Sequence, residues 1–189
     1  MYTIPNHLRK IAGKTNLTHP GKYLAFILRH DPGSIGLKLD KNGWADIDVL
    51  IRKSKIKLNR ELIEEIVKKD NKQRYRISDD GSKIRASQGH SIKVDLGLEP
   101  KKPPKYLYHG TADRFLGSIL SKGIEKRSRQ DVHLSLDEET AEKVGKRHGK
   151  PVILRVKAGE MHNKGCEFRL SDNKVWLIEE VPPEFIERI

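Results

Sequence analysis

The chain has 189 residues, of which 35% are hydrophobic and 34% charged, and its formal net charge is +12. This composition is typical of a globular protein, and no apolar run approaches the roughly 20 residues that cross a membrane. Cys166 is the only cysteine, which excludes an intrachain disulfide and a cysteine-cluster metal site and favours a cytoplasmic location. The positive excess predicts an acidic partner, with nucleic acid ranked before a membrane surface.

The first predicted element is a helix that follows a short basic arm at residues 1–17. Thr18 can cap its start. Apolar residues then recur at the helical spacing i, i+3, i+4. They are Tyr23, Phe26 and Ile27. The pattern predicts an amphipathic helix with one buried face.

This helix should end near His30, because Pro32 disfavours helical geometry at the residue before it. Arg29 and His30 then lie in the last turn. Two cations there can simply complement the helix dipole. Alternatively, a rigid helix directs a planar guanidinium and an imidazole at an anionic substrate.

Further short elements follow up to residue 70. A turn is expected at 33–36 and a strand at 37–40. Asp46 and Asn59 stand where helix caps are expected, each before an apolar stripe. The sequence thus predicts two more helices after the first.

Two alternating runs at 74–78 and 82–86 flank the turn sequence Asp79-Asp80-Gly81, and this pattern predicts a hairpin. Three helices followed by a hairpin are the outline of a winged helix. That module binds nucleic acid in some proteins and serves as a protein-contact scaffold in others, so it does not settle function.

Residues 96–105 are rich in proline and lysine and are predicted to be a linker between two domains. The second half reads as short strands with small helices, which favours an α+β domain of two packed sheets. Strands are expected at 106–111, 132–135, 152–156, 168–170 and 175–178, and helices at 115–120, ending at Gly123, and after Asp137.

Several cationic features could grip a phosphate, which arginine binds with two parallel hydrogen bonds. They are Arg29 with His30, Arg74, the run Arg85-Ala86-Ser87-Gln88-Gly89-His90-Ser91, and Arg129. An arginine considered alone is more often a solvated surface charge, and the run containing Gly89 also suits an ordinary turn.

His109-Gly110-Thr111 after a strand offers an imidazole, a close backbone approach and a hydroxyl, groups that could hold a ribose. His133 lies on the opposite face of its strand from its neighbours, as a ligand-binding or a core histidine would. The chain has no dinucleotide-binding glycine fingerprint, Walker loop or HExxH motif, and its histidines are too scattered for a metal site.

Taken together and in order, these blocks resemble the RNA 2′-phosphotransferase family, enzymes that use NAD⁺ to remove the 2′-phosphate left at a tRNA splice junction. The resemblance covers roughly residues 18–186. The blocks are Leu28-Arg29-His30, Lys72-Gln73-Arg74-Tyr75, Ile84 to Ser91, Tyr108-His109-Gly110-Thr111 and Val132-His133-Leu134-Ser135.

The resemblance implies an α+β fold with an N-terminal winged-helix domain at 1–95, a linker at 96–105 and a domain like that of ADP-ribosyltransferases at 106–189. It also implies site residues. The catalytic ones are Arg29, His30, Arg74 and Arg129; the NAD-binding ones are His109, Gly110, Thr111, His133, Leu134 and Ser135; the RNA-binding ones are Arg85, Gln88, His90 and Ser91. No metal is implied, and a monomer is expected.

The family's counterpart of the transferase triad reads His, His, Val, and it maps onto His109, His133 and Val181. A carboxylate in the third position would repel a phosphate nucleophile, which needs no general base. One departure is Asp131, where the family often has histidine two residues after its last essential arginine, here Arg129.

The implied reaction has two steps. The RNA 2′-phosphate displaces nicotinamide from NAD⁺ to give an RNA-2′-phospho-ADP-ribosyl intermediate. The ribose O2″ then attacks phosphorus, which releases 2′-OH RNA and ADP-ribose 1″,2″-cyclic phosphate. Two alternatives stay open: ADP-ribosylation of terminal phosphates on RNA or DNA, and a non-enzymatic winged-helix regulator that binds nucleic acid.

Overall fold

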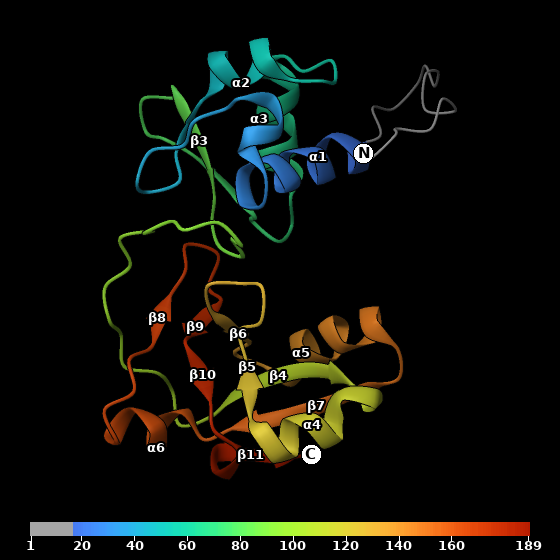
Figure 1. The fold of residues 1–189 in the computed structure, drawn as a ribbon, viewed down its shortest axis with the longest axis vertical. Helices are drawn as coiled ribbons and strands as arrows, with labels where there is room; N and C mark the ends of the chain where they lie inside the picture. Colours follow the sequence, from blue (N-terminus) through green and yellow to red (C-terminus); the bar gives the residue numbers. More distant parts are fainter. Residues whose placement is uncertain (1–16) are drawn as a thin grey trace.

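The computed structural model describes residues 17–189, so the arm predicted at 1–17 lies outside the described residues except for its last position. The elements gather into two groups, one above the other in Figure 1, and the segment after β3 connects them. Each group has its own cluster of buried apolar side chains. In the described part of the chain, no helix is both long and apolar enough to span a membrane.

The N-terminal group has three α-helices and a small antiparallel sheet with strand order β1-β3-β2. Its elements are α1 (Thr18–Arg29), the 3-10 helix η2 (Pro32–Ile35), β1 (Ala45–Asp46), α2 (Ile47–Lys53), α3 (Arg60–Lys69), β2 (Tyr75–Ile77) and β3 (Lys83–Ala86). Leu24, Ile27 and Leu28 of α1 are at most 1% exposed, so α1 is the buried helix that its apolar spacing predicted.

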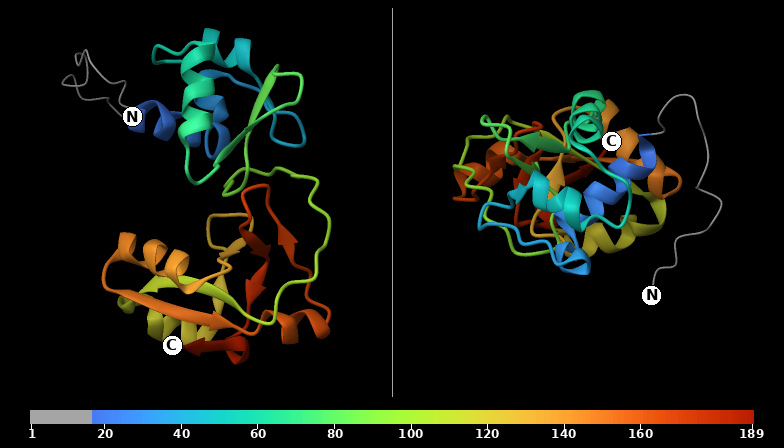
Figure 2. Two further views of the ribbon diagram at one scale, coloured as in Figure 1. Left: turned by 180° about the vertical axis from the view of Figure 1, so that it is seen from behind. Right: turned by 90° about the horizontal axis from the view of Figure 1, so that it is seen from above.

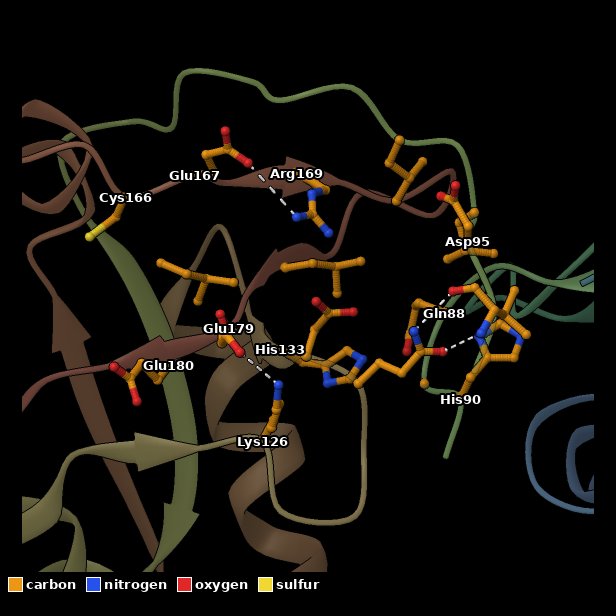
Figure 3. Close-up of a pocket in the computed structure, with 18 of the residues that line it drawn as sticks. Gln88, His90, Asp95, Lys126, His133, Cys166, Glu167, Arg169, Glu179 and Glu180 are labelled. Carbon is orange, nitrogen blue, oxygen red and sulfur yellow. Dashed lines mark hydrogen bonds and ion pairs between the residues drawn. The ribbon is translucent and has the colours of Figure 1, made fainter. Parts of the chain in front are cut away.

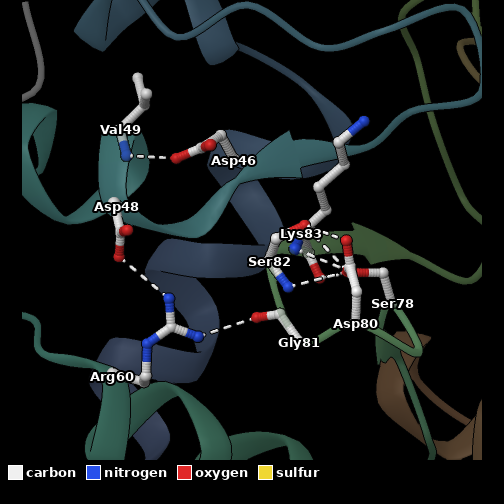
Figure 4. Close-up of polar contacts among 9 residues, drawn as sticks. All are labelled: Asp46, Asp48, Val49, Arg60, Ser78, Asp80, Gly81, Ser82 and Lys83. Carbon is white, nitrogen blue, oxygen red and sulfur yellow. Dashed lines mark hydrogen bonds and ion pairs between the residues drawn. The ribbon is translucent and has the colours of Figure 1, made fainter.

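Local hydrogen bonds explain where α2 and the hairpin form (Figure 4). Asp46 caps α2 by accepting a hydrogen bond from the Val49 amide at 2.8 Å, as predicted. Arg60, the first residue of α3, donates to the Gly81 carbonyl at 2.8 Å and pairs with Asp48 at 3.0 Å. The hairpin turn is thereby held against α2 and α3.

Two local predictions are wrong. Thr18 does not precede α1 as its cap; it is the first helical residue, and Leu17 is the N-cap. Residues 37–40 form no strand. Asp40 instead accepts hydrogen bonds from the amides of Asn42 and Trp44, both at 3.0 Å, and folds the segment into a turn.

The C-terminal group has more strands than the sequence predicted, because strands of only two or three residues are too short to show the alternating pattern of apolar and polar residues. Its helices are α4 (Asp113–Lys122), α5 (Glu138–Gly145), η3 (Lys146–His148), α6 (Ala158–Asn163) and η4 (Pro183–Phe185). Its strands are β4 (Leu107–Ala112), β5 (Ile124–Glu125), β6 (Val132–Leu134), β7 (Pro151–Val156), β8 (Arg169–Leu170), β9 (Trp176–Ile178), β10 (Glu180–Val181) and β11 (Ile186–Arg188).

These strands form three small antiparallel sheets, with orders β11-β7-β4, β6-β9-β8 and β10-β5. An isolated bridge joins Tyr108 of β4 to Ser135, the residue after β6, so the first two sheets come together at this point. Leu154 of the first sheet, Leu134 of the second, and Phe168, which directly precedes β8, are 0% exposed. The fold is therefore mixed α and β with small antiparallel sheets.

The segment predicted as a linker follows the edge of the C-terminal group (Figure 2). Pro100 bridges to Arg169, and the Lys101 amide donates to the Phe168 carbonyl at 2.7 Å. The Gly159 amide donates to the Lys105 carbonyl at 3.0 Å. These contacts give the connecting segment a defined course along β8 and α6.

Candidate functional site

The C-terminal end of α1 carries the first site residue, Arg29. Its Nε and Nη2 atoms are buried and have no hydrogen-bond partner within residues 17–189. Burial lowers the pKa of this guanidinium; Tyr75 opposes the shift, and the charges of Arg74 and Arg129 add to it. A cation whose donor atoms are buried without hydrogen-bond partners is unfavourable unless an anion binds to those donors.

The loop after β3 wraps around the same helix end. Gly89 adopts φ +86°, and a Cβ on it would lie 3.6 Å from the Arg29 guanidinium carbon. The Ser91 amide donates to the Arg29 carbonyl at 3.0 Å, and the Ser91 hydroxyl lies 2.9 Å from His30 Nδ1. The loop thus fixes both cationic side chains at the end of α1.

Arg74 comes from the segment between α3 and β2. Its guanidinium pairs with Asp70, and its amide donates to the same carboxylate at 2.6 Å. The Asp70 side chain is only 7% exposed, whereas that of Arg74 is 37% exposed. The carboxylate therefore orients Arg74 while its outer donors stay accessible.

Arg129 comes from the segment between β5 and β6, and its Nη1 lies 3.3 Å from Nδ1 of His133. Because arginine can only donate, His133 Nδ1 accepts and the proton of the neutral ring is on Nε2. That Nε2 is buried without a partner in the described chain. His109 Nδ1 lies 3.1 Å from the His133 carbonyl oxygen and must donate to it, which leaves His109 Nε2 as an acceptor.

The charges of these groups interact, which places them in one cluster. Burial lowers the pKa of His30, and the charges of Arg29 and Arg129 lower it further. Burial also lowers the pKa of His133, and the positive charges of Arg129 and then Arg29 lower it further. The cluster of Arg29, His30, Arg74, Arg129 and His133 joins elements from both halves of the chain. An anion bound there would relieve the mutual repulsion of its cations.

A cavity of about 690 Å³ lies beside this cluster, between the β6-β9-β8 sheet and residues 88–98 (Figure 3). This volume is in the range of small-molecule sites. Of the residues predicted from sequence, Gln88, His90 and His133 line it. Ion pairs between Lys126 and Glu179 and between Arg169 and Glu167 lie at its rim.

Two histidines on this cavity stay neutral at physiological pH. Burial, and then the charges of Arg29 and His30, lower the pKa of His90 to about 4. Burial and the charges of Arg129 and Arg29 lower the pKa of His133 to about 3. Neutral imidazoles can exchange hydrogen bonds with hydroxyl groups without adding charge.

We expect these histidines to make the protein less stable in acid. In the unfolded chain both have pKa values near 6.5, so between pH 6.5 and about 4 the unfolded state binds more protons. Their stabilising contribution is complete above pH 6.5 and falls by up to about 1.4 kcal/mol per pH unit for each histidine. Chemical denaturation at pH 7, 6 and 5 measures the slope.

His90→Asn should make that slope shallower, whereas the exposed His148→Asn should leave it unchanged. An identical slope for wild type and His90→Asn would show that His90 takes up its proton over the same pH range in the folded and the unfolded protein, which would contradict the lowered pKa.

Two residues expected in the RNA site lie in other contacts. Arg85 is 7% exposed, pairs with Asp172 at 2.7 Å and lies 4.7 Å over the Trp44 ring. This ion pair joins the hairpin of the N-terminal group to a turn of the C-terminal group. Ser91 contacts His30 and does not line the cavity.

Some residues expected at the NAD site have structural contacts. A Cβ on Gly110 would lie 1.6 Å from the Ala141 carbonyl oxygen, so its missing side chain makes room for α5. The side chains of Leu134 and Val181 are in the C-terminal core at 0% and 1% exposed. Thr111 is 6% exposed, and Ser135 exchanges backbone hydrogen bonds with Tyr108.

Sequence reasoning missed two residues that position the cluster. Asp70 holds Arg74, as described above. The side chain of Gln130 accepts a hydrogen bond from the Val94 backbone amide at 2.8 Å and donates one to the Val94 carbonyl at 2.9 Å. The backbone amide of Gln130 donates to the His90 carbonyl at 3.1 Å. No sequence period links Gln130 to Val94, so this contact has no local signal.

Among residues 17–189, no group of three histidine, cysteine, aspartate or glutamate side chains is arranged to hold a metal ion.

Comparison with known proteins identifies similar sequences. The family described as "RNA 2′-phosphotransferase, Tpt1 / KptA family" matches residues 15–180. A "Probable RNA 2′-phosphotransferase" of Flavobacterium johnsoniae is 53% identical over 169 residues, 88% of this chain and 93% of that protein. Proteins of the same description from Rhodopirellula baltica and Nostoc punctiforme are 51% and 47% identical, over 90% and 93% of this chain and 95% and 98% of theirs.

Proposed function

The chain belongs to the RNA 2′-phosphotransferase family, and from that premise we propose that it transfers an internal RNA 2′-phosphate to NAD⁺-derived ADP-ribose. The observation that carries the proposal is the cationic cluster, above all the two buried nitrogens of Arg29 that have no hydrogen-bond partner in the part of the chain that the structure describes. A phosphate monoester is nearly a dianion at neutral pH and accepts several charge-assisted hydrogen bonds. It is the ligand that would satisfy these donors.

In this proposal Arg29, His30 and Arg74 hold the 2′-phosphate. Asp70 keeps Arg74 oriented, and the loop that carries Ser91 keeps His30 in place. No carboxylate activates the nucleophile, because an ionised phosphate is already reactive. The role of the protein in this proposal is to bind and orient the phosphate.

NAD⁺ supplies an activated ribose whose C1″ accepts the phosphate oxygen as nicotinamide leaves. His109 Nε2 is an acceptor, and His133 Nε2 is a donor with no partner among residues 17–189. The two atoms fit ribose hydroxyls, which both donate and accept. The O2″ hydroxyl would then attack phosphorus and lose its proton. The bond from phosphorus to the RNA 2′-oxygen would break, that oxygen would take up a proton to become the 2′-OH, and ADP-ribose 1″,2″-cyclic phosphate would leave. Arg129 would stabilise the charge that develops at phosphorus in this second step.

We further propose two domains: a winged-helix domain at 1–95 and an ADP-ribosyltransferase-like domain at 106–189, joined by 96–105. The two separate clusters of buried apolar side chains support this division. The three helices and the β2–β3 hairpin support the first assignment. Packing of Gly110 against α5 supports a structural role for one residue expected at the NAD site, and burial of Val181 supports one for the third residue of the triad. Location in the cytoplasm and a monomeric state stay predictions.

The test is incubation with NAD⁺ and an oligoribonucleotide that carries one internal 2′-phosphate, with every product identified. We expect nicotinamide, 2′-OH RNA and the cyclic phosphate. Nicotinamide release with a stable ADP-ribosylated terminal phosphate would instead favour an enzyme that stops after one step. RNA binding without nicotinamide release would favour a regulator.

Arg129→Ala should separate the two chemical steps. The first step needs a gripped phosphate and a positioned ribose, so nicotinamide release should stay within about tenfold of wild type. The second step should slow on the order of 100-fold, as for loss of one preorganised donor. A single-turnover time course with labelled RNA should therefore show the phospho-ADP-ribosyl intermediate accumulate.

The exposed Arg114→Ala is the matched control and should behave as wild type. If Arg129→Ala blocks nicotinamide release without a build-up of intermediate, Arg129 serves binding or the first step.

A further inference from the structure

An exposed ridge on α1 and its C-cap residue His30 leads directly to the cationic cluster. Lys22, Phe26 and His30 are spaced four residues apart, and all three are exposed. Residues at this spacing share one face of a helix. The ridge spans roughly 12 Å, from about 1.5 Å of rise per residue.

Phe26 is the unusual member of this ridge. Its side chain is 48% exposed, and its ring centroid lies 6.3 Å from that of His30, tilted by 44°. The other large hydrophobic residues exposed in the described chain are aliphatic: Leu120, Leu136 and Ile189. The core contacts of α1 come from its opposite side, through Leu24, Ile27 and Leu28. The Phe26 ring is therefore exposed to solvent and is not needed for packing of the core.

The ridge combines the groups that bind a single nucleic acid strand. Such sites pair cations that follow the phosphate backbone with aromatic rings on which bases stack, whatever the sequence. Lys22 supplies a cation, Phe26 a ring, and His30 leads into the phosphate cluster. The net charge of +12 favours a polyanionic occupant.

We propose that this ridge binds the nucleotide next to the 2′-phosphate, with its base stacked on Phe26 and its backbone phosphate beside Lys22. The inference rests on the proposed function and adds a subsite for the RNA. It gives the chain a contact to RNA that is independent of sequence, so that recognition depends on the 2′-phosphate and an unpaired neighbouring base.

The test is RNA binding measured by fluorescence anisotropy, with a labelled single-stranded oligoribonucleotide carrying one 2′-phosphate and no NAD⁺. Phe26→Ala should weaken binding roughly 5- to 100-fold, the range for loss of one stacked base, and Phe26→Tyr should restore it. Lys22→Gln should reduce the slope of log K against log salt by about 0.7, as for one contact to a single strand.

Leu120→Ala and Lys122→Gln are matched controls, because both residues are exposed on α4; neither should change binding. Wild type should lose affinity for RNA that lacks the base on one side of the 2′-phosphate, and Phe26→Ala should lose nothing more on that RNA. Wild-type affinity of Phe26→Ala, or an equal loss on intact and abasic RNA, would overturn the stacking assignment. If wild type binds the RNA but forms no product, the proposed reaction fails while the ridge stands.

Discussion

Arg29→Ala should lower kcat/KM for the 2′-phosphorylated RNA by roughly 30- to 1000-fold, which corresponds to about 2–4 kcal/mol of transition-state stabilisation. The physical reason is that Arg29 is preorganised: its Nε and Nη2 atoms are buried and have no partner among the described residues, and the loop at Gly89 packs beside it. Arg29→Lys should not restore activity, because an ammonium lacks the two-pronged geometry of guanidinium.

The same substitution should leave folding intact or make the protein slightly more stable, because it removes a buried cation whose donors are unsatisfied. Thermal melting measures this. Arg52→Ala is the control, since Arg52 also lies in the last turn of a helix but is exposed. Near-normal turnover of Arg29→Ala would contradict the phosphate role, and a collapsed melting temperature would show that Arg29 serves the fold.

Gly110→Ala should largely destroy the fold of the C-terminal half. The added Cβ would lie 1.6 Å from the Ala141 carbonyl oxygen and 2.9 Å from the Gly145 amide nitrogen. These are backbone atoms of α5, so no side-chain rotation can relieve the clash, and α5 would have to move off β4. Overpacking commonly costs about 1–3 kcal/mol, and more where backbone must shift. Circular dichroism and melting curves should show the loss.

Gly117→Ala is the matched control, because nothing lies within 4 Å of a Cβ built there in α4. It should stabilise the protein by roughly 0.5–1 kcal/mol, the usual gain for alanine over glycine inside a helix. If Gly110→Ala instead folds normally and loses only NAD binding, then the glycine serves the ligand, as the sequence resemblance implies.

Local patterns in the sequence were enough to predict many elements. Asp46, Asn59 and Asp137 all cap helices as expected, because a cap needs only one side chain and an amide three residues later. The hairpin at Asp80 also formed as predicted. The prediction of a strand at 37–40 was wrong, because hydrogen bonds to the Asp40 side chain fold that segment into a turn.

The arrangement of the candidate site could be predicted only in part. The pattern of α1 placed Arg29 and His30 at the end of a buried helix, and the structure agrees. It did not show that Asp70 holds Arg74, nor that Arg85 pairs with Asp172, 87 residues away. Pairings between distant segments depend on how the two halves pack, which no local period encodes.

The sequence by itself determined the family, the positive charge and the position of the cationic residues along the chain. These properties follow from residue identity and short-range spacing. Only the tertiary structure decided which residues converge. It left two nitrogens of Arg29 and the Nε2 of His133 buried without a hydrogen-bond partner among residues 17–189, and it gave Gly110 a packing role. The reason is that burial and the donor or acceptor state of a group depend on neighbours brought together by folding.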